Sequence, residues 1–376
     1  MANKNLNAAK TAKKDEFYTQ MTDIERELQH YWPHFRDKVV LCNCDDPYES
    51  NFFKYFALRF NQLGLKKLIC TCFDGSPVQG NELLLQFDWD DVDEGTDASE
   101  RRNSDECHAR KRDLLPKKIA YKVEITEVKD LNGDGALDLA DVQYLLKNNK
   151  NVISLLKQHG DFRSAECIEL LKQADIVVTN PPFSLFREYI GQLMKYEKKF
   201  LIIGNQNNIT YKEVFPLLMR NEVWLGHKSG DMAFRVPKDY EARETRYWQD
   251  ESGQKWRSMG NICWFTNLDH NKRHEGIDLV CRFSVEEYPT FDNYNAINVG
   301  RVDDIPYDYK GAMGVPITFL DKYSPEQFEI LSANDYRRDN SVPMKAHGLI
   351  KDKEGAIKGK PTYVRILIRN KHPKQL

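Results

Sequence analysis

The amino-acid sequence predicts an α/β fold built around a parallel sheet. Three short apolar runs, at residues 38–43, 67–72 and 175–179, are rich in β-branched side chains and bounded by turn residues, which is typical of buried strands. Segments with helical periodicity at residues 50–60 and 164–174 separate these runs. Strands that alternate with helices usually pair in parallel through right-handed crossovers, so we expect a parallel sheet.

Later elements continue this alternation. The helix at residues 164–174 starts at Ser164, a favourable N-cap, and carries Glu166 in its first turn, where the helix dipole stabilises an acid. Three more elements are expected: a strand at residues 199–204, a helix over residues 211–220 and a strand at residues 222–225.

Length and composition limit the class of protein. A chain of 376 residues predicts about two domains, each large enough for its own core. Charged residues make up 30% of the chain and the formal net charge is −2, so any surface that binds nucleic acid must be local. No apolar stretch is long enough to cross a membrane and the amino terminus lacks the apolar core of a signal peptide, which predicts a cytoplasmic protein.

The eight cysteines do not suggest a disulfide framework in a chain of this size. Cys42 with Cys44, and Cys70 with Cys72, form two Cys-x-Cys pairs near the ends of two predicted strands. Zinc is one interpretation of these pairs, but tetrahedral zinc sites usually show wider spacing. We expect thiols packed as small hydrophobic side chains on adjacent strands.

The tetrapeptide Asn180-Pro181-Pro182-Phe183 directly follows the predicted strand at residues 175–179. Proline cannot donate a hydrogen bond to a sheet and restricts the residue before it, so the strand must end here. The Asn180 side chain and the Pro181 carbonyl should therefore point out of the carboxyl edge of the sheet, where open α/β sheets bind their ligands.

These residue types suit methylation of an exocyclic amine such as adenine N6. The amine is a poor nucleophile because its lone pair is delocalised into the ring, and two acceptors on its N–H groups, Asn180 and the Pro181 carbonyl, would favour a more nucleophilic nitrogen. Phe183 would stack on a base extruded from the duplex and offset part of the unstacking cost. The alternative is a proline-terminated strand without catalytic meaning, and the preceding strand favours the methyltransferase interpretation.

A methyl donor would bind across the carboxyl ends of the first strands. The usual methyltransferase has a glycine-rich turn after its first strand, but residues 43–47 read Asn43-Cys-Asp45-Asp46-Pro. In place of the glycines, the pair Asp45 and Asp46 offers carboxylates that can accept from the amino group of S-adenosylmethionine.

Two further segments are candidates for the donor pocket. Upstream of the first predicted helix, Phe17, Tyr18 and Thr19 offer two aromatic rings and a hydroxyl. Downstream, Asp161 can accept from the amino group of the donor's adenine while Phe162 stacks on its ring. A helix cap for Asp161 and core packing for Phe162 are ordinary alternatives, and both remain open.

Residues 88–150 change the character of the chain. Residues 88–106 hold nine acids against two bases, which predicts a solvated surface excursion that would repel DNA. Residues 130–141 then match the spacing of a calcium-binding loop, although a turn built on Asn-Gly and Asp-Gly explains the same residues. The loop would place ligands at Asp130, Asn132, Asp134, Ala136, Asp138 and Asp141.

Taken together, the motifs resemble the EcoRI-type DNA adenine-N6 methyltransferase family along nearly the whole chain. The matching strings are DEFYTQ, VVLCNCDDP, SNFFKYF, GDFRS, DIVVTNPPFSLFREY, KKFLIIGN, ITYKEVFPL and GVPITFL. The resemblance implies a class I Rossmann-like methyltransferase sheet, S-adenosylmethionine as donor, catalytic residues 180–183, a donor pocket formed by the three segments above, and a role in restriction-modification. The insertion at residues 88–150 departs from the catalytic pattern.

We assign residues 1–226 to a catalytic domain and residues 227–376 to a target-recognition region for double-stranded DNA. Residues 341–376 hold nine lysines and arginines against two acids, a charge excess suited to phosphate contact. We expect a monomer. Two other classes stay open at this point: a methyltransferase that acts on a protein glutamine amide, and a non-enzymatic calcium-dependent interaction module.

Overall fold

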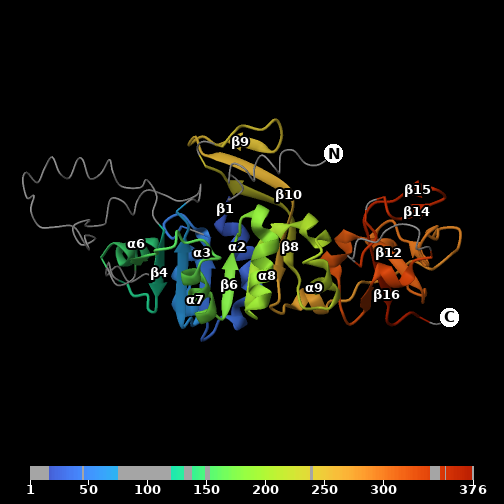
Figure 1. Ribbon diagram of the computed structural model, residues 1–376, viewed down its shortest axis with the longest axis horizontal. Helices are drawn as coiled ribbons and strands as arrows, with labels where there is room; N and C mark the ends of the chain where they lie inside the picture. Colours follow the sequence, from blue (N-terminus) through green and yellow to red (C-terminus); the bar gives the residue numbers. More distant parts are fainter. Residues whose placement is uncertain are drawn as a thin grey trace, which may run out of the picture.

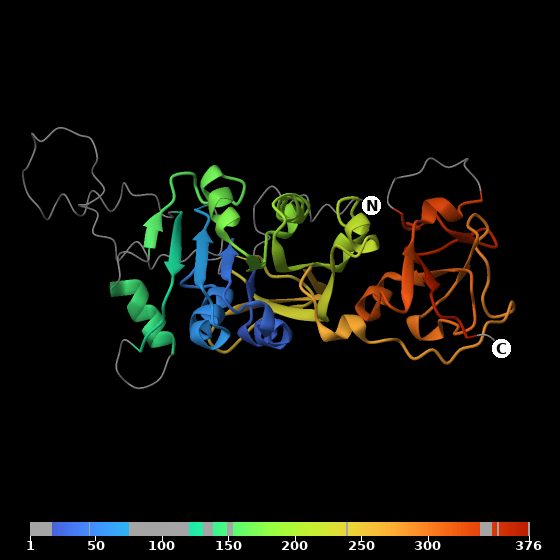
Figure 2. The ribbon, with the colours of Figure 1, turned by 90° about the horizontal axis from the view of Figure 1, so that it is seen from below.

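The computed structural model describes residues 17–44, 46–74, 120–130, 138–148, 153–237, 240–338, 348–351 and 353–374. In these parts of the chain a ten-stranded mixed sheet forms the main body, and a four-stranded sheet lies toward the C-terminus (Figures 1 and 2). Within the described ranges, no helix combines the length and the apolar character that a membrane crossing needs.

The centre of the main sheet is parallel, as the sequence predicts. Its four strands lie in the order β7 (Lys199–Asn205), β6 (Ile176–Thr179), β2 (Val39–Asn43) and β3 (Lys67–Cys72). All residues of β2 and β6 are buried, which explains their near-continuous apolar sequence. The chain order reverses between β2 and β6, so their carboxyl ends form a topological switch point.

Antiparallel strands flank this centre and make the sheet mixed. β4 (Tyr121–Ile125) and β5 (Ile153–Leu155) extend it beyond β3. On the other side, β10 (Lys255–Thr266) pairs with β7, and β8 (Trp224–Arg235) pairs with β10. The expected strand at residues 222–225 is thus the start of a much longer one, and residue 226 falls inside β8. β1 (Tyr18–Thr19) pairs with β8, and β9 (Tyr247–Gln249) pairs with β10.

The ends of β8 and β10 extend beyond the carboxyl edge of the parallel strands. Ile262 of β10 is paired with Asn205, the last residue of β7, so residues 255–261 lie past that edge. Together with β9 and residues 231–235 of β8, they form a three-stranded projection that we call the arm (Figure 1).

Helices cover both faces of the sheet. Apolar side chains of α7 (Ala165–Gln173) and α8 (Phe186–Lys195) pack on one face, and those of α2 (Met21–Leu28), α3 (Asn51–Leu58) and α6 (Leu139–Asn148) on the other. Ser164 caps α7 through the Cys167 main-chain N–H at 3.2 Å, as predicted. The helix expected at residues 211–220 is shorter, because Pro216 stands at the start of α9 (Phe215–Met219). The other helical segments are α4 (Phe60–Leu63), η1 (Gln29–His34), η4 (Phe183–Leu185), η5 (Gln206–Thr210), η6 (Asn271–His274), η7 (Val302–Asp304), η8 (Ile317–Lys322) and η9 (Ala333–Tyr336).

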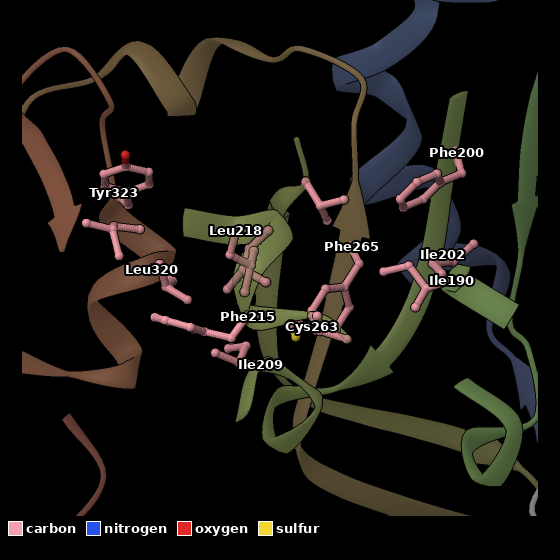
Figure 3. Packing of buried hydrophobic residues seen from close by; sticks show 14 of the residues in the cluster. Ile190, Phe200, Ile202, Ile209, Phe215, Leu218, Cys263, Phe265, Leu320 and Tyr323 are labelled. Atoms are coloured by element: carbon pink, nitrogen blue, oxygen red, sulfur yellow. The ribbon is translucent and has the colours of Figure 1, made fainter. Parts of the chain in front are cut away.

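The C-terminal region packs on the main body through a continuous apolar core. Figure 3 shows Phe215 and Leu218 of α9 beside Leu320 and Tyr323 of the C-terminal region. All four side chains belong to one buried cluster with the sheet residues Phe200 and Ile202. The C-terminal strands are β11 (Ala296–Asn298), β12 (Ala312–Pro316), β13 (Phe328–Leu331) and β16 (Arg365–Asn370), with a hairpin of β14 (Ala356–Ile357) and β15 (Lys360–Pro361).

The Cys-x-Cys pairs lie on adjacent strands. Cys42 of β2 is in register with Cys70 of β3, and both side chains are fully buried in the core with Cys72. Among the described residues, no group of three or more histidine, cysteine or acidic side chains is placed to hold a metal ion. The thiols of Cys42, Cys70 and Cys72 are thus packed as small core side chains, and Cys44 is half-buried against the core on the other face of the sheet.

Candidate active site

Hydrogen bonds join the ends of β2 and β6 at the switch point. The Thr179 hydroxyl donates to the Asn43 carbonyl, and the Tyr189 hydroxyl of α8 donates to Asn43 Oδ1. Asn43 is 5% exposed. This predicted cofactor residue thus connects two strands and a helix directly beneath the tetrapeptide.

Asn180 places an acceptor at this edge that no described residue satisfies. The side chain is 6% exposed, and its Nδ2 donates to the Phe17 carbonyl at 2.9 Å. That bond fixes the orientation of the amide, so Oδ1 is turned the other way, where it is buried without a hydrogen-bond partner in the described part of the chain. An unpaired buried acceptor costs roughly 1–3 kcal/mol, and such a group calls for a functional explanation.

Phe183 belongs to an aromatic cluster built from distant segments. Its ring centroid lies 5.9 Å from that of Phe17 and 6.4 Å from that of Phe234 on β8. Tyr240 adds a fourth ring, 6.1 Å from Phe17. Pairing of β1 with β8, with Thr19 opposite Phe234, brings the amino-terminal segment to the tetrapeptide. Phe234 and Tyr240 were not predicted, because nothing near them in the sequence signals this non-local pairing.

A cavity of about 1170 Å³ opens beside Phe183. Its wall on the sheet side includes Asn208 of η5 and Tyr211, and its wall on the arm side includes Arg246 and Arg257. Two arginines of the predicted recognition region therefore share one hollow with the predicted catalytic aromatic ring.

The turn after β2 is organised by Asp46, which is 3% exposed. Its Oδ1 accepts from the Tyr121 hydroxyl at 2.6 Å and from the Tyr48 main-chain N–H at 2.9 Å. Burial, followed by the charge of Asp46, raises the pKa of Tyr121, which keeps its hydroxyl a donor. Asp46 is thus held rigidly at the carboxyl end of β2, and Asp45 lies outside the described residues.

Tyr18 and Thr19 face the same edge from β1. The Arg235 guanidinium lies 4.0 Å from the Tyr18 ring centroid and forms an ion pair with Glu49. Burial is the main cause that raises the pKa of Tyr18. The hydroxyls of Thr19 and of Thr71, near the end of β3, are buried without a partner among the described residues. Unsatisfied hydroxyls at a sheet edge fit a site that takes a polar ligand.

Asp161 and Phe162 reach the site through a turn that rests on the end of β3. Gly160 has φ +71°, and a Cβ there would lie 2.2 Å from the Cys72 carbonyl oxygen, so only glycine fits. Asp161 binds Arg163 through both carboxylate oxygens, at 2.9 and 2.7 Å. These bonds to Asp161 are the first cause that raises the pKa of Arg163. Phe162 is 4% exposed and packs edge-on against Tyr189.

The predicted calcium loop falls mostly outside the described residues, which include neither Asn132, Asp134 nor Ala136. Asp130 is described, and Asp138 and Asp141 lie at the start of α6. Asp138 Oδ1 accepts from the Ala140 main-chain N–H at 2.7 Å, and Asp141 Oδ2 accepts from the Asp138 N–H at 3.0 Å. Both carboxylates therefore act in capping the helix.

A mixed sheet with a parallel centre and a topological switch point is consistent with a Rossmann-like methyltransferase, the class of protein that the sequence motifs resemble. The comparisons specify which one. A family model described as adenine-specific methyltransferase EcoRI matches residues 5–371, and the chain belongs to this family. The resemblance of the sequence motifs is confirmed.

Three named relatives span nearly the same length. Type II methyltransferase M.EcoRI of Escherichia coli is 45% identical over 98% of this chain and 97% of its own. M.MpnI of Mycoplasma pneumoniae is 34% identical, over 97% and 98% respectively, and M.MgeORF184P of Mycoplasma genitalium is 33% identical, also over 97% and 98%. No solved structure matches the chain. The protein is an adenine-specific DNA methyltransferase of the type II class, which decides against both the glutamine-amide and the non-enzymatic alternatives.

Proposed function

We propose that this enzyme moves the methyl group of S-adenosylmethionine to N6 of an adenine that has been extruded from double-stranded DNA, in a modification role. The observation that supports this most is the unpaired Asn180 Oδ1, buried beside Phe183 at the switch point of the sheet. The mechanism begins with these two residues.

Asn180 Oδ1 accepts one N6–H of the target base, and the Pro181 carbonyl accepts the other. Both bonds strengthen as positive charge develops on the nitrogen, so they stabilise the transition state more than the ground state. Phe183 stacks on the extruded ring, and the neighbouring Phe17 and Phe234 rings hold Phe183 in place. The sulfonium of the bound donor supplies an electrophilic methyl group.

The donor pocket lies along the carboxyl ends of β2 and β3. Phe17, Tyr18 and Thr19 border it on one side, Asn43 and Asp46 form its floor, and Asp161 and Phe162 border it on the other. Asp45, which lies outside the described residues, stays a predicted donor contact. The unpaired Thr19 and Thr71 hydroxyls support a polar ligand here. Asp161 already binds Arg163 through both carboxylate oxygens, so a bound donor would share this acceptor with the guanidinium.

DNA binds across the arm and the C-terminal region. Both the arm and the β14–β15 hairpin lie at the top of the molecule in Figure 1, on the side to which the carboxyl edge of the sheet opens. Lys358 and Lys360 on that hairpin are exposed. Arg365 and Arg369 are engaged in the protein instead, with Asn298 and Glu329. The catalytic body then includes the sheet portions of β8 and β10, and recognition uses the rest of residues 227–376.

A labelling experiment tests the proposal. The protein is incubated with S-adenosylmethionine labelled in the methyl group and with double-stranded DNA, and the digested nucleosides are separated. Label in N6-methyldeoxyadenosine is expected, whereas label in a cytosine derivative, or none in DNA, contradicts the assignment. Light scattering on the free and DNA-bound protein tests the further expectation that the enzyme acts as a monomer.

The loop at residues 130–141 is proposed as a weak structural calcium site, supported by its ligand spacing. A ligand that binds only the folded form raises the melting temperature by mass action. Calcium should do so for the native chain but not for the Asp130→Ala, Asp134→Ala double variant, with methylation retained in both. An unchanged melting curve in millimolar calcium would favour the alternative, a turn built on Asn-Gly and Asp-Gly that binds no calcium.

A further inference from the structure

A second unpaired amide lies one strand away from Asn180. Asn208 belongs to η5, the turn that follows β7, and lines the cavity beside Phe183. The residue is 2% exposed, and its Nδ2 is buried without a hydrogen-bond partner in the described part of the chain. β6 and β7 are parallel neighbours, so Asn180 and Asn208 follow strand ends that open on the same edge.

The surroundings of Asn208 are built to hold this amide. A Cβ on Gly204 would lie 3.0 Å from Asn208 Nδ2 and 2.6 Å from Phe186, so glycine leaves the room that the amide occupies. Asn205 begins the turn and its Oδ1 accepts from the Asn207 main-chain N–H at 2.9 Å and from Asn261 Nδ2 of the arm at 2.8 Å. The turn is thus fixed both internally and to the arm.

The two unpaired groups have opposite hydrogen-bonding sense. Asn180 offers an acceptor and Asn208 offers donors. Adenine presents the complementary pattern, an N6–H donor beside ring-nitrogen acceptors. On the corresponding edge, guanine and thymine place a carbonyl oxygen next to an N–H. The carbonyl oxygen would then face the acceptor of Asn180, and the N–H would face the donors of Asn208. Flipped bases are commonly read through that edge.

We propose that the Asn208 side-chain amide donates a hydrogen bond to a ring nitrogen of the target adenine, and so helps to select adenine over guanine and thymine. The inference rests on the proposed function, because it requires adenine in the cavity beside Phe183. Asn205 acts as a positioning residue that holds the turn against the arm.

Atom-deletion substrates test the contact. DNA is prepared with adenine, 1-deazaadenine, 3-deazaadenine or 7-deazaadenine at the target position, and single-turnover methylation rates and binding constants are measured for the native enzyme and for Asn208→Ala. The analogue that lacks the contacted nitrogen should lose one hydrogen bond to the native enzyme. Its methylation should then be reduced roughly tenfold relative to adenine.

The decisive quantity is the coupling between the two deletions. If Asn208 contacts that nitrogen, the analogue that costs the native enzyme roughly tenfold should cost Asn208→Ala little or nothing. Changes in the intrinsic reactivity of the analogue cancel, because they affect both enzymes equally. Asn207→Ala is the matched control: its side chain is exposed on the same turn, and it should retain the full penalty of the analogue.

The outcomes separate this inference from the proposed function. If the native enzyme methylates adenine but none of the three analogues is impaired, or if Asn208→Ala shows the full penalty with each, the contact is refuted while the activity stands. If the native enzyme does not methylate DNA adenine, the proposed function itself fails. Should Asn208→Ala not fold, judged by its melting curve, Asn208→Asp, which lacks the donor but keeps the size of the side chain, takes its place in the coupling measurement. The binding constants of the native enzyme for the analogue series, which do not depend on the reactivity of N6, then show whether a ring nitrogen is contacted.

Discussion

The main body holds two buried polar side chains, Glu27 of α2 and Asn180 after β6, that differ in how fully their hydrogen-bonding atoms are paired. Glu27 is fully buried, and its carboxylate accepts three bonds: from the Tyr31 hydroxyl at 2.8 Å, the His227 main-chain N–H at 2.6 Å and the Lys228 N–H at 2.7 Å. Asn180 makes one bond and leaves its oxygen unpaired.

The structure around Glu27 explains a local irregularity of the sheet. The pairing of β8 with β10 shifts register between Cys263 and Phe265, which leaves residues of β8 without partners in β10. Glu27 binds two of those main-chain N–H groups, and a Cβ at Gly226 would lie 2.4 Å from its Oε1, so glycine admits the carboxylate. A buried group that serves stability finds its partners within the chain, while one that serves binding keeps capacity for a ligand.

The largest effect should follow from Asn180→Ala. Removal of an interaction made mainly in the transition state should lower the methylation rate by about two or more orders of magnitude. Stability should fall only modestly, by roughly 0.5–1.5 kcal/mol, because the substitution removes the single bond from Nδ2 to the Phe17 carbonyl and the oxygen that is lost has no partner among the described residues. Single-turnover kinetics and thermal melting measure the two quantities, and binding of the donor and DNA should be retained.

Asn180→Asp is the companion variant. It keeps an acceptor oxygen, so it should be less impaired in rate than Asn180→Ala. Near-normal turnover of the alanine variant would refute the active-site assignment, and a large fall in its melting temperature would remove the contrast with Glu27.

Glu27→Ala should show the reverse pattern. Three donors would lose their acceptor, and since an unpaired buried donor costs roughly 1–3 kcal/mol, a loss of about 3 kcal/mol or more in unfolding free energy is expected. Urea unfolding measures this, with methylation per folded molecule near that of the native enzyme. Glu25→Ala on the same helix is the control, because its ion pair with Arg59 is partly exposed and worth at most about 1 kcal/mol.

Exposed charges form a third group, which serves neither the chemistry nor the core. Neutralising Lys358 and Lys360 should reduce the slope of log binding constant against log salt concentration by about 1.8, since each phosphate contact contributes roughly 0.9. Sequence preference should be unchanged. Lys172→Ala is the control, because α7 ends at the amino edge of β6, opposite the site. An unchanged slope in the double variant would place the β14–β15 hairpin off the DNA.

These contrasts also explain what the sequence could predict. The strand and tetrapeptide around Asn180 are contiguous, so local pattern and chemistry were enough to locate them. Phe17 reaches Asn180 across 163 residues through β1–β8 pairing, which no local pattern signals. The long β8 was expected to end at residue 225, because residues 227–231 are polar or glycine and at least partly exposed, which interrupts the apolar pattern before Met232 and Phe234 are buried again.

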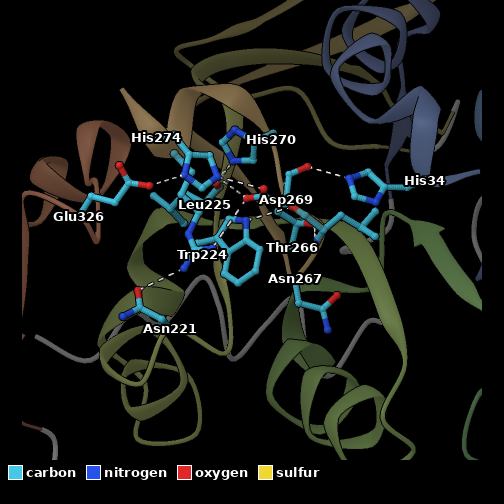
Figure 4. A network of polar contacts seen from close by, with 12 residues as sticks. His34, Asn221, Trp224, Leu225, Thr266, Asn267, Asp269, His270, His274 and Glu326 are labelled. Carbon is cyan, nitrogen blue, oxygen red and sulfur yellow. Dashed lines mark hydrogen bonds and ion pairs between the residues drawn. The ribbon is translucent and has the colours of Figure 1, made fainter. Parts of the chain in front are cut away.

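The smallest expected effect concerns His274, whose two ring nitrogens both have acidic partners but lie partly exposed to solvent. His274, at the end of η6, binds Asp269 through Nε2 and Glu326 of the C-terminal region through Nδ1, each at 2.9 Å (Figure 4). Its contacts with Glu326 and then Asp269 raise the pKa of His274 above its usual value of 6.5. Since the imidazole is 44% exposed, solvent screening limits the contribution to about 1 kcal/mol or less.

The sign of the pH dependence follows from the raised pKa. A histidine that binds its proton more tightly when folded stabilises the protein fully below the unfolded pKa of 6.5, and that stabilisation is lost as the pH rises through the folded pKa. The difference in melting temperature between the native enzyme and His274→Gln should therefore be positive at pH 5.5 and shrink toward zero in mildly alkaline buffer. High salt should reduce it as well. A difference that grows with pH would mean that the neutral imidazole holds the C-terminal region in place, so that the hydrogen bonds, and not the charge, carry the contact.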